Sequence, residues 1–555
     1  MKDAWRLRLA YFLIASAVAM LVCTIVSTSI YSIGSSGFGL VSRLPIFFWV
    51  GLVLLCFLWY VGHRSGKMPV AALVLTISFL FIAPAIVKVP VWLSNSYYPY
   101  AESSLIDTSG HLVDRPSAAL FSYHEWPIFL YLASVVKITT GIGDELLLKY
   151  FPIVTISLYG LLASLVLKSK LRAEYAVLGA AWLLASYWLR QQYFGPQGIA
   201  YILFLAAFLL ITWIFFDERG SKRRLMGLFL FVFALLTLTH VLTAFMCITL
   251  LVALYISQRF FIKRLSSHLT KLITFSVVFF FFYNVFFTGN FFQFAIQRMH
   301  ESVLSITGGS FVSEASRVIG SPANRLNYYS SWGTVLISAG IALVSLILIA
   351  RKFLSREKLS KEGYTVFCGL SLIFFVVYGI TLQYGLHEAY QRAFMFGLVP
   401  LTFLCINLLK NKPKLLLGVL AVLIFLNIPA QYGSDSFRLS TAQELAGSKF
   451  FATFSPQNTS CFDEFSLYVR YYNPAKNVTF ETIVASAPSV RAPNETFVAE
   501  KLSKVSYVIS SQLEDNYYQY YLGNNPLNQA NLDRFNRVYD DGDFLIFGKT
   551  DDNHG

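Results

Sequence analysis

The chain has 555 residues, of which 56% are hydrophobic and 17% aromatic, while only 13% are charged. Soluble domains carry about 25% charged residues, so no aqueous fold covers this much apolar surface, and lipid must surround much of the chain. The formal net charge of +14 does not indicate nucleic-acid binding, because the basic residues stand in short clusters between apolar runs. Only one of the six cysteines, Cys461, lies in the C-terminal tail, which excludes a disulfide or metal framework of cysteines there.

Thirteen apolar runs have the length of membrane-spanning helices. In chain order they cover 9–31, 45–62, 68–91, 148–167, 174–189, 196–216, 223–239, 242–258, 271–288, 333–350, 364–383, 390–409 and 414–430. The two runs beside His240 could also form one long kinked segment, which would change the count. The first run is longer than the core of a usual signal peptide and lacks an evident cleavage site, so it is interpreted as a spanning helix.

The basic residues predict how these helices are oriented. Cytoplasmic loops of membrane proteins are enriched in Lys and Arg. With the N-terminus in the cytoplasm, the cytoplasmic segments contain 24 of the 44 basic residues. They lie at 2–8, 64–67, 168–172, 219–224, 259–271, 351–361 and 410–414. We therefore expect a multi-pass protein of the plasma membrane with a cytoplasmic N-terminus and an extracellular C-terminal domain.

Two long outer loops are expected, at 92–147 and 289–332. The first contains an amphipathic stretch from Trp126 to Ile142, which predicts a helix lying at the outer membrane interface. The helical membrane domain would cover 1–431, because the composition changes abruptly after Gln431.

The tail, 432–555, predicts a small extracytoplasmic α+β domain. We expect a helix at 441–453 and strands at 505–510 and 544–547, with turns at 524–526 and 540–542. Three glycosylation sequons, beginning at Asn458, Asn477 and Asn494, occur in this segment and nowhere else. Their confinement to the tail agrees with its expected location outside the cell.

Polar residues gather at the outer ends of the predicted helices and in the first outer loop, which suggests a cavity at outer-leaflet depth. Arginine binds phosphate oxygens bidentately, and a carboxylate can remove the proton of an acceptor hydroxyl. The catalytic candidates are Glu102 and Asp107. The candidates for substrate binding are His111, His124, Glu125, Arg190, Gln191, Gln197, His240, Arg298, His387, Glu388 and Arg392. For Arg190 and His240 the competing interpretation is that of a polar residue that anchors a helix end.

Several segments resemble the GT-C class of membrane glycosyltransferases, which depend on polyprenyl-phosphate sugars. The first outer loop, with Ile106-Asp-Thr-Ser-Gly-His-Leu112 and Tyr123-His-Glu-Trp-Pro-Ile-Phe129, is similar to that of archaeal-type members. Polar helix-end segments such as Tyr193-Phe-Gly-Pro-Gln-Gly-Ile-Ala200 and Leu238-Thr-His-Val-Leu-Thr243 resemble segments that recur in the class. The tail ends in Arg537-Val-Tyr-Asp-Asp-Gly-Asp543, much like tails of archaeal members.

This resemblance implies transfer of a sugar from a polyprenyl-phosphate carrier to a surface glycan, glycolipid or protein. It implies Glu102 or Asp107 as general base, Arg190 and Arg392 as phosphate clamps, and a lipid-linked donor; a divalent cation is compatible, although no ligand spacing demands one. The chain departs from the class because 92–102 contains no Asp and the Trp-Trp-Asp signature of oligosaccharyltransferases is missing. Two alternatives stay open. One is a polysaccharide polymerase or ligase that uses the second long loop (Arg298, His300 and Arg317), and the other is a transporter or assembly protein.

Overall fold

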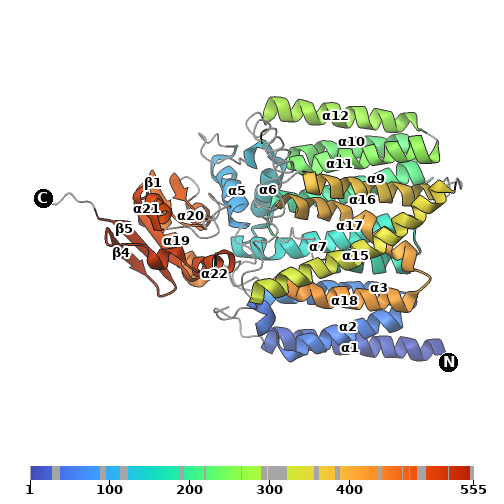
Figure 1. Ribbon diagram of the computed structural model, residues 1–555, viewed down its shortest axis with the longest axis horizontal. Helices are drawn as coiled ribbons and strands as arrows, with labels where there is room; N and C mark the ends of the chain where they lie inside the picture. The colour runs from blue at the N-terminus through green and yellow to red at the C-terminus, as the bar shows by residue number, and fades with distance from the viewer. Residues whose placement is uncertain are drawn as a thin grey trace.

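The structure is a computed structural model of the chain. It describes residues 2–27, 38–87, 96–112, 123–186, 193–217, 221–263, 265–288, 297, 322–355, 362–381, 388–433, 441–464, 467–473, 476–483, 495–522 and 524–550. Long helices lie side by side in a bundle, and a smaller domain that contains the strands sits at one end of it (Figure 1). The N-terminus lies at the opposite end.

Each of the thirteen predicted spanning runs coincides with a helix. These are α1 (Lys2–Ser27), α2 (Ile46–Gly62), α3 (Met68–Ile77) continued by η2 (Ser78–Ile82) and α4 (Ala83–Val87), α7 (Asp144–Lys168), α8 (Ala173–Ala185), α9 (Pro196–Phe216), α10 (Lys222–Thr239), α11 (Val241–Ile256), α12 (Ser267–Phe287), α15 (Pro322–Leu354), α16 (Gly363–Thr381), α17 (Glu388–Leu409) and α18 (Pro413–Tyr432). Helices form here because lipid offers the backbone no other hydrogen-bond partner. Helix α15 already begins at Pro322, inside the range expected as the second long loop, most of which lies outside the described residues.

Among the described residues, eight helices are long and apolar enough to cross a membrane. They are α1, α3 with α4, α7, α9, α11 with the π-helical turn that follows it, α12, α15 and α18. The chain is therefore a multi-pass helical membrane protein. The total of thirteen crossings stays a prediction, because α2, α8, α16 and α17 offer only shorter apolar segments and α10 begins with three basic residues.

The segments on either side of His240 form two helices, α10 and α11, that lie next to each other in the bundle (Figure 1). His240 alone separates them and has an extended backbone, with φ −164° and ψ 115°. The alternative of a single long kinked segment is therefore wrong.

Buried polar side chains join helices inside the bundle. The indole of Trp182 donates a hydrogen bond to Ser338 Oγ at 3.2 Å, and the Tyr201 hydroxyl donates to the carbonyl of Met395 at 3.0 Å. On the outside of the bundle, by contrast, large apolar side chains are exposed. On α12, for example, Phe282 and Phe286 are 53% and 72% exposed. An exposed apolar surface of this kind is what a helix that faces lipid presents.

The C-terminal domain contains a five-stranded sheet of order β2-β1-β3-β5-β4. Its strands are β1 (Thr459–Phe462), β2 (Val478–Glu481), β3 (Tyr507–Ser511), β4 (Phe535–Asp540) and β5 (Phe544–Lys549). Strands β2, β1 and β3 are parallel, whereas β3, β5 and β4 are antiparallel. The helices are α19 (Ala442–Phe454), α20 (Leu467–Tyr472), α21 (Glu495–Ser503), α22 (Gln512–Tyr521) and the short η9 (Pro526–Gln529).

The predicted helix and both predicted strands of this domain are confirmed as α19, β3 and β5. The predicted turn at 540–542 joins β4 to β5, and Gly542 has φ +74°, a conformation that favours glycine. The division of the chain at residue 431 stays a prediction; helix α18 ends at Tyr432 and α19 begins at Ala442.

Two helices from the first outer loop, α5 (Tyr97–Ser109) and α6 (Ile128–Thr140), lie between the bundle and the C-terminal domain (Figure 1). The short η4 (Tyr123–Glu125) precedes α6 in the chain. Helix α6 confirms the predicted amphipathic helix. Its position next to α5 brings the carboxylates of the first loop to one end of the bundle.

Candidate functional site

Helices α5 and α6 form the framework of the candidate site and end in the same way. Gly110 and Gly141 follow them with φ values of +73° and +62°, and their N–H groups donate to the carbonyls of Ile106 and Lys137 at 2.8 and 3.0 Å. A glycine in the left-handed conformation is a common helix terminator, because it satisfies a carbonyl of the last turn. One apolar cluster holds the two helices together. It includes Tyr97, Tyr100, Ile106, Phe129, Leu130, Leu148 and Phe194.

Glu102 is the buried carboxylate of this site. Its side chain is 3% exposed, and Oε2 lies 2.5 Å from Nε2 of His124, whose side chain is 14% exposed. A buried carboxylate is costly unless a charged or hydrogen-bonding partner compensates it, which His124 does here. The sequence analysis named both residues as candidates, and the structure brings them together.

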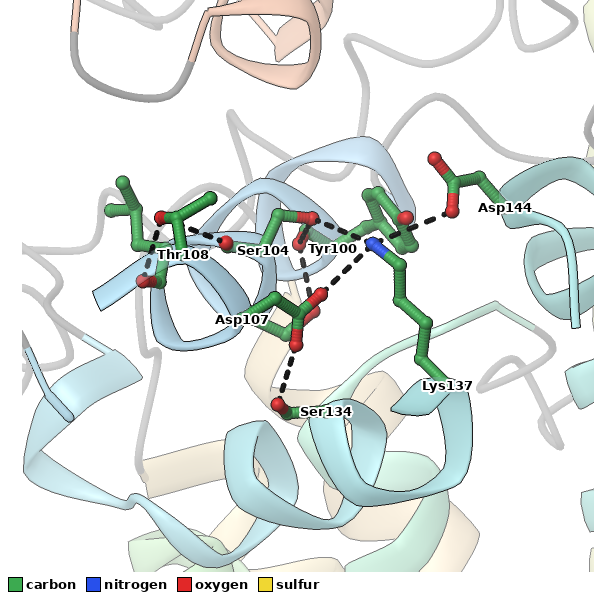
Figure 2. A network of polar contacts seen from close by, with 9 residues as sticks. Tyr100, Ser104, Asp107, Thr108, Ser134, Lys137 and Asp144 are labelled. Carbon is green, nitrogen blue, oxygen red and sulfur yellow. Dashed lines mark hydrogen bonds and ion pairs between the residues drawn. The ribbon is translucent and has the colours of Figure 1, made fainter. Parts of the chain in front are cut away.

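Asp107, the second catalytic candidate, is held by α6 (Figure 2). Ser134 Oγ donates to Oδ1 of Asp107 at 2.5 Å, and Lys137 Nζ lies 2.9 Å from Oδ2. Lys137 also lies 3.4 Å from Oδ1 of Asp144, at the start of α7. Both oxygens of Asp107 are therefore engaged by α6, so its carboxylate braces two helices.

Lys137 retains its proton firmly. Burial lowers its pKa, but the contacts with Tyr100 and Asp107 and the charges around it outweigh burial, so the net pKa is raised. The ammonium group lies 4.7 Å from the centre of the Tyr100 ring, a cation–π distance. Burial raises the pKa of Tyr100 to about 12, so this phenol is neutral near pH 7.

The C-terminal domain contacts the site through α20. Tyr468 and Tyr471 pack against Tyr97, with ring centres 5.1 and 4.8 Å apart, and Tyr471 also contacts Tyr100 at 5.4 Å. These edge and tilted ring contacts are favourable arrangements for aromatic pairs. Helix α5 is thus packed between α6 on one side and the C-terminal domain on the other.

Gln197 and His240 belong to the helices of the bundle. Gln197 is 1% exposed, in the first turn of α9. Directly before that turn, the backbone N–H of Phe194 donates to Ser96 Oγ at 3.1 Å, which ties the start of α9 to the start of α5. His240 precedes α11, and its Nδ1 lies 3.0 Å from Thr243 Oγ1.

The other candidates are dispersed or not described. His111 is exposed, and its Nδ1 contacts the carbonyl of Leu112. Glu125 accepts a hydrogen bond from the Tyr283 hydroxyl, at 2.6 Å, through its backbone carbonyl. Arg190, Gln191, Arg298 and His387 lie outside the described residues, and Glu388 and Arg392 belong to α17 with side chains that are likewise not described. The binding roles of these candidate residues therefore stay predictions.

The sequence analysis missed the basic partner of Asp107. Lys137 lies on the polar side of the predicted amphipathic stretch, so its charge was visible, but no pattern indicated which carboxylate it would meet. Among the described residues, no group of three His, Cys, Asp or Glu side chains could hold a metal ion.

No protein-family model and no curated protein matches this chain. Among solved structures, it is similar to the oligosaccharyltransferase of Archaeoglobus fulgidus in complex with Zn and sulfate, with 13% identity over 83% of this chain and 70% of that chain, at a TM-score of 0.49. ArnT from Cupriavidus metallidurans in the apo state matches with 12% identity over 87% and 97%, at a TM-score of 0.48. ArnT bound to undecaprenyl phosphate matches with 13% identity over 85% and 98%, at a TM-score of 0.34. Similarities of this size establish neither a family nor an activity for this chain.

Proposed function

We propose that the chain is a membrane glycosyltransferase of the GT-C kind. It takes a sugar from a polyprenyl-phosphate carrier and transfers it to a surface glycan, glycolipid or protein. One observation carries this proposal: the buried carboxylate of Glu102, 2.5 Å from His124, at the end of a membrane bundle. A buried acid–histidine pair of this kind suits proton removal from a hydroxyl group.

In the proposed reaction, the acceptor hydroxyl oxygen attacks the anomeric carbon of the sugar. The bond between that carbon and the phosphate oxygen breaks, and its electron pair leaves with the polyprenyl phosphate. The proton of the acceptor passes to the Glu102 carboxylate. His124, in contact with Oε2 of Glu102, orients the carboxylate before the transfer.

We assign the base to Glu102 and not to Asp107 because of the contacts that Asp107 makes. Asp107 forms an ion pair with Lys137 and accepts a hydrogen bond from Ser134, so both of its oxygens already join α5 to α6. We assign Asp107 the role of holding α5 against α6, and therefore of positioning Glu102.

Four further candidates are assigned to the substrate. Arg190 and Arg392 would hold the donor phosphate, since guanidinium groups pair bidentately with phosphate oxygens. His240 and Gln197 would contact the sugar or the phosphate. The proposal also includes the predicted topology, with the N-terminus in the cytoplasm and the site and the C-terminal domain outside the plasma membrane.

The test uses the full-length protein in lipid nanodiscs with a panel of radiolabelled polyprenyl-monophosphate sugars and an extract of surface glycans, lipids and proteins as acceptors. Glu102→Gln should lower the transfer rate by about 100-fold or more, the usual contribution of a general base. Asp107→Asn should lower thermal stability together with the rate. Wild-type transfer by Glu102→Gln, or no use of any donor by the wild type, would overturn the proposal.

A further inference from the structure

The first turn of α9 combines two features that suit an anion. The helix is 21 residues long, its N-cap is Gly195, and no side chain caps it. Pro196 occupies the first helical position. Pro196 has no N–H, and the N–H of Gly198 donates to the carbonyl of Gly195 at 3.1 Å, which leaves the N–H of Gln197 for an anion. The start of a helix also carries a partial positive charge that attracts anions.

The second feature is the side chain of Gln197. It is 1% exposed, and neither Nε2 nor Oε1 has a hydrogen-bond partner in the part of the chain that the structure describes. A buried amide without partners costs free energy, so such a group in a folded protein calls for a polar ligand or water. Side chains on a helix lean toward its N-terminus, so this amide leans toward the uncapped first turn.

The packing around this turn is tight and fixed. The Tyr159 hydroxyl donates to the carbonyl of Gly198 at 2.8 Å, and a Cβ added to Gly198 would lie 3.3 Å from the Phe151 ring. These contacts hold the backbone of the turn in place, so its N–H groups keep a fixed direction, which suits an electrostatic role.

The turn also lies near the proposed base. The contact between Phe194 N and Ser96 Oγ ties it to the start of α5. Glu102 follows Ser96 by six residues, which is roughly 9 Å along a helix. A donor sugar between the two would have its phosphate on the side of α9, and the acceptor hydroxyl would approach its anomeric carbon from the side of Glu102.

We infer that the first turn of α9 and the amide of Gln197 bind the phosphate of the lipid-linked donor. This inference rests on the proposed function and names the place where its leaving group is held. As the bond from the anomeric carbon to the phosphate oxygen breaks, the phosphate gains a second negative charge. The helix N-terminus and the Gln197 NH₂ group stabilise that charge, and the polyprenyl phosphate leaves with the electron pair.

The experiment measures binding, not transfer, so that it stays separate from the proposed chemistry. Polyprenyl monophosphate, polyprenol and inorganic phosphate are titrated into full-length protein in nanodiscs. The variants are Gln197→Leu, which keeps the size without the amide, and Gln197→Glu, which introduces a negative charge. Gln258→Leu is the control, because Gln258 is also buried but its Oε1 accepts from Ser266 N on a different turn.

Gln197→Leu should weaken binding of polyprenyl monophosphate by about tenfold, and Gln197→Glu by more, because a hydrogen bond to a charged group is lost or replaced by repulsion. Polyprenol binding and the Gln258→Leu control should not change. If Gln197→Leu fails to fold, Gln197→Met, which is of similar length and also lacks the amide, provides the same comparison. The inference would be overturned if Gln197→Leu bound polyprenyl monophosphate as tightly as the wild type, or if it lost as much affinity for polyprenol. It would also be overturned if inorganic phosphate bound the wild type as tightly as polyprenyl monophosphate. Glu102→Gln should bind polyprenyl monophosphate normally without transferring sugar, so a failure of the proposed base would appear separately.

Discussion

Glu444 of α19 makes the C-terminal domain sensitive to pH. The side chain is 2% exposed, and Oε1 accepts a hydrogen bond from the N–H of Leu513 at 3.3 Å. Burial raises its pKa from 4.5 to about 8; the charges of Asp463 and Asp543 add to this, and a hydrogen bond from Ser511 opposes it. In the unfolded chain the carboxyl would titrate near 4.5, so the folded state binds a proton that the unfolded state releases between these pH values.

The sign of the effect follows from proton linkage. Folding stability is greatest below pH 4.5, where both states are protonated, and it falls as the pH rises toward 8. Release of one proton changes the unfolding equilibrium about tenfold per pH unit. Between pH 4.5 and pH 8 the free energy of unfolding therefore falls by at most about 5 kcal/mol. Glu514 lies near Glu444, and burial raises its pKa as well, so the two carboxyl groups act in the same direction.

The assay is hydrogen–deuterium exchange of α19 and β3 in the full-length protein, with Glu444→Gln as the reference at every pH. The amide of Gln can still accept from Leu513 N but does not titrate. We expect nearly equal protection at pH 4 and, at pH 8, faster exchange in the wild type by about tenfold or more. Equal exchange at both pH values, or better protection of the wild type at pH 8, would refute the reasoning.

Two further predictions concern packing. Gly447→Ala should destabilise the C-terminal domain by about 1–3 kcal/mol, because the added Cβ would lie 2.0 Å from the Phe544 ring. The control is Gly418→Ala, whose added Cβ has no neighbour within 4 Å and which should be neutral or slightly stabilising. Thermal unfolding of both variants measures this, and equal effects would contradict it. Tyr471→Ala should speed hydrogen exchange in α5, since it removes ring contacts worth about 1 kcal/mol each, while Tyr471→Phe should behave as wild type; an equal effect of Phe would implicate the hydroxyl instead.

The helical part of the fold was predictable because each apolar run must satisfy its own backbone in lipid. The ends were less predictable: Pro322 begins α15 well before the apolar run, since polar residues can extend a helix beyond the hydrocarbon region. The joint at His240 could not be resolved either, because a kink and a reversal need the same polar residue between two apolar runs.

The site was predictable in its residues but not in its pairings. Glu102, Asp107 and His124 stood out because charged residues in an outer loop of a membrane protein are candidates for chemistry. Which residues they meet depends on how α5 packs against η4 and α6, and the apolar cluster that includes Phe129 and Leu130 holds α5 and α6 together. The contact between Tyr471 and Tyr100 joins residues far apart in the chain, and no local pattern encodes it.

The tyrosine contacts of α20 also have a consequence for the order in which the molecule is assembled. Helix α5 is synthesised early, but Tyr468 and Tyr471, which cover Tyr97 and Tyr100, emerge only after the last bundle helix. A growing chain can therefore insert its helices while this aromatic face of α5 is still bare. In a polypeptide truncated after Tyr432, the aromatic face of α5 would stay without this cover permanently.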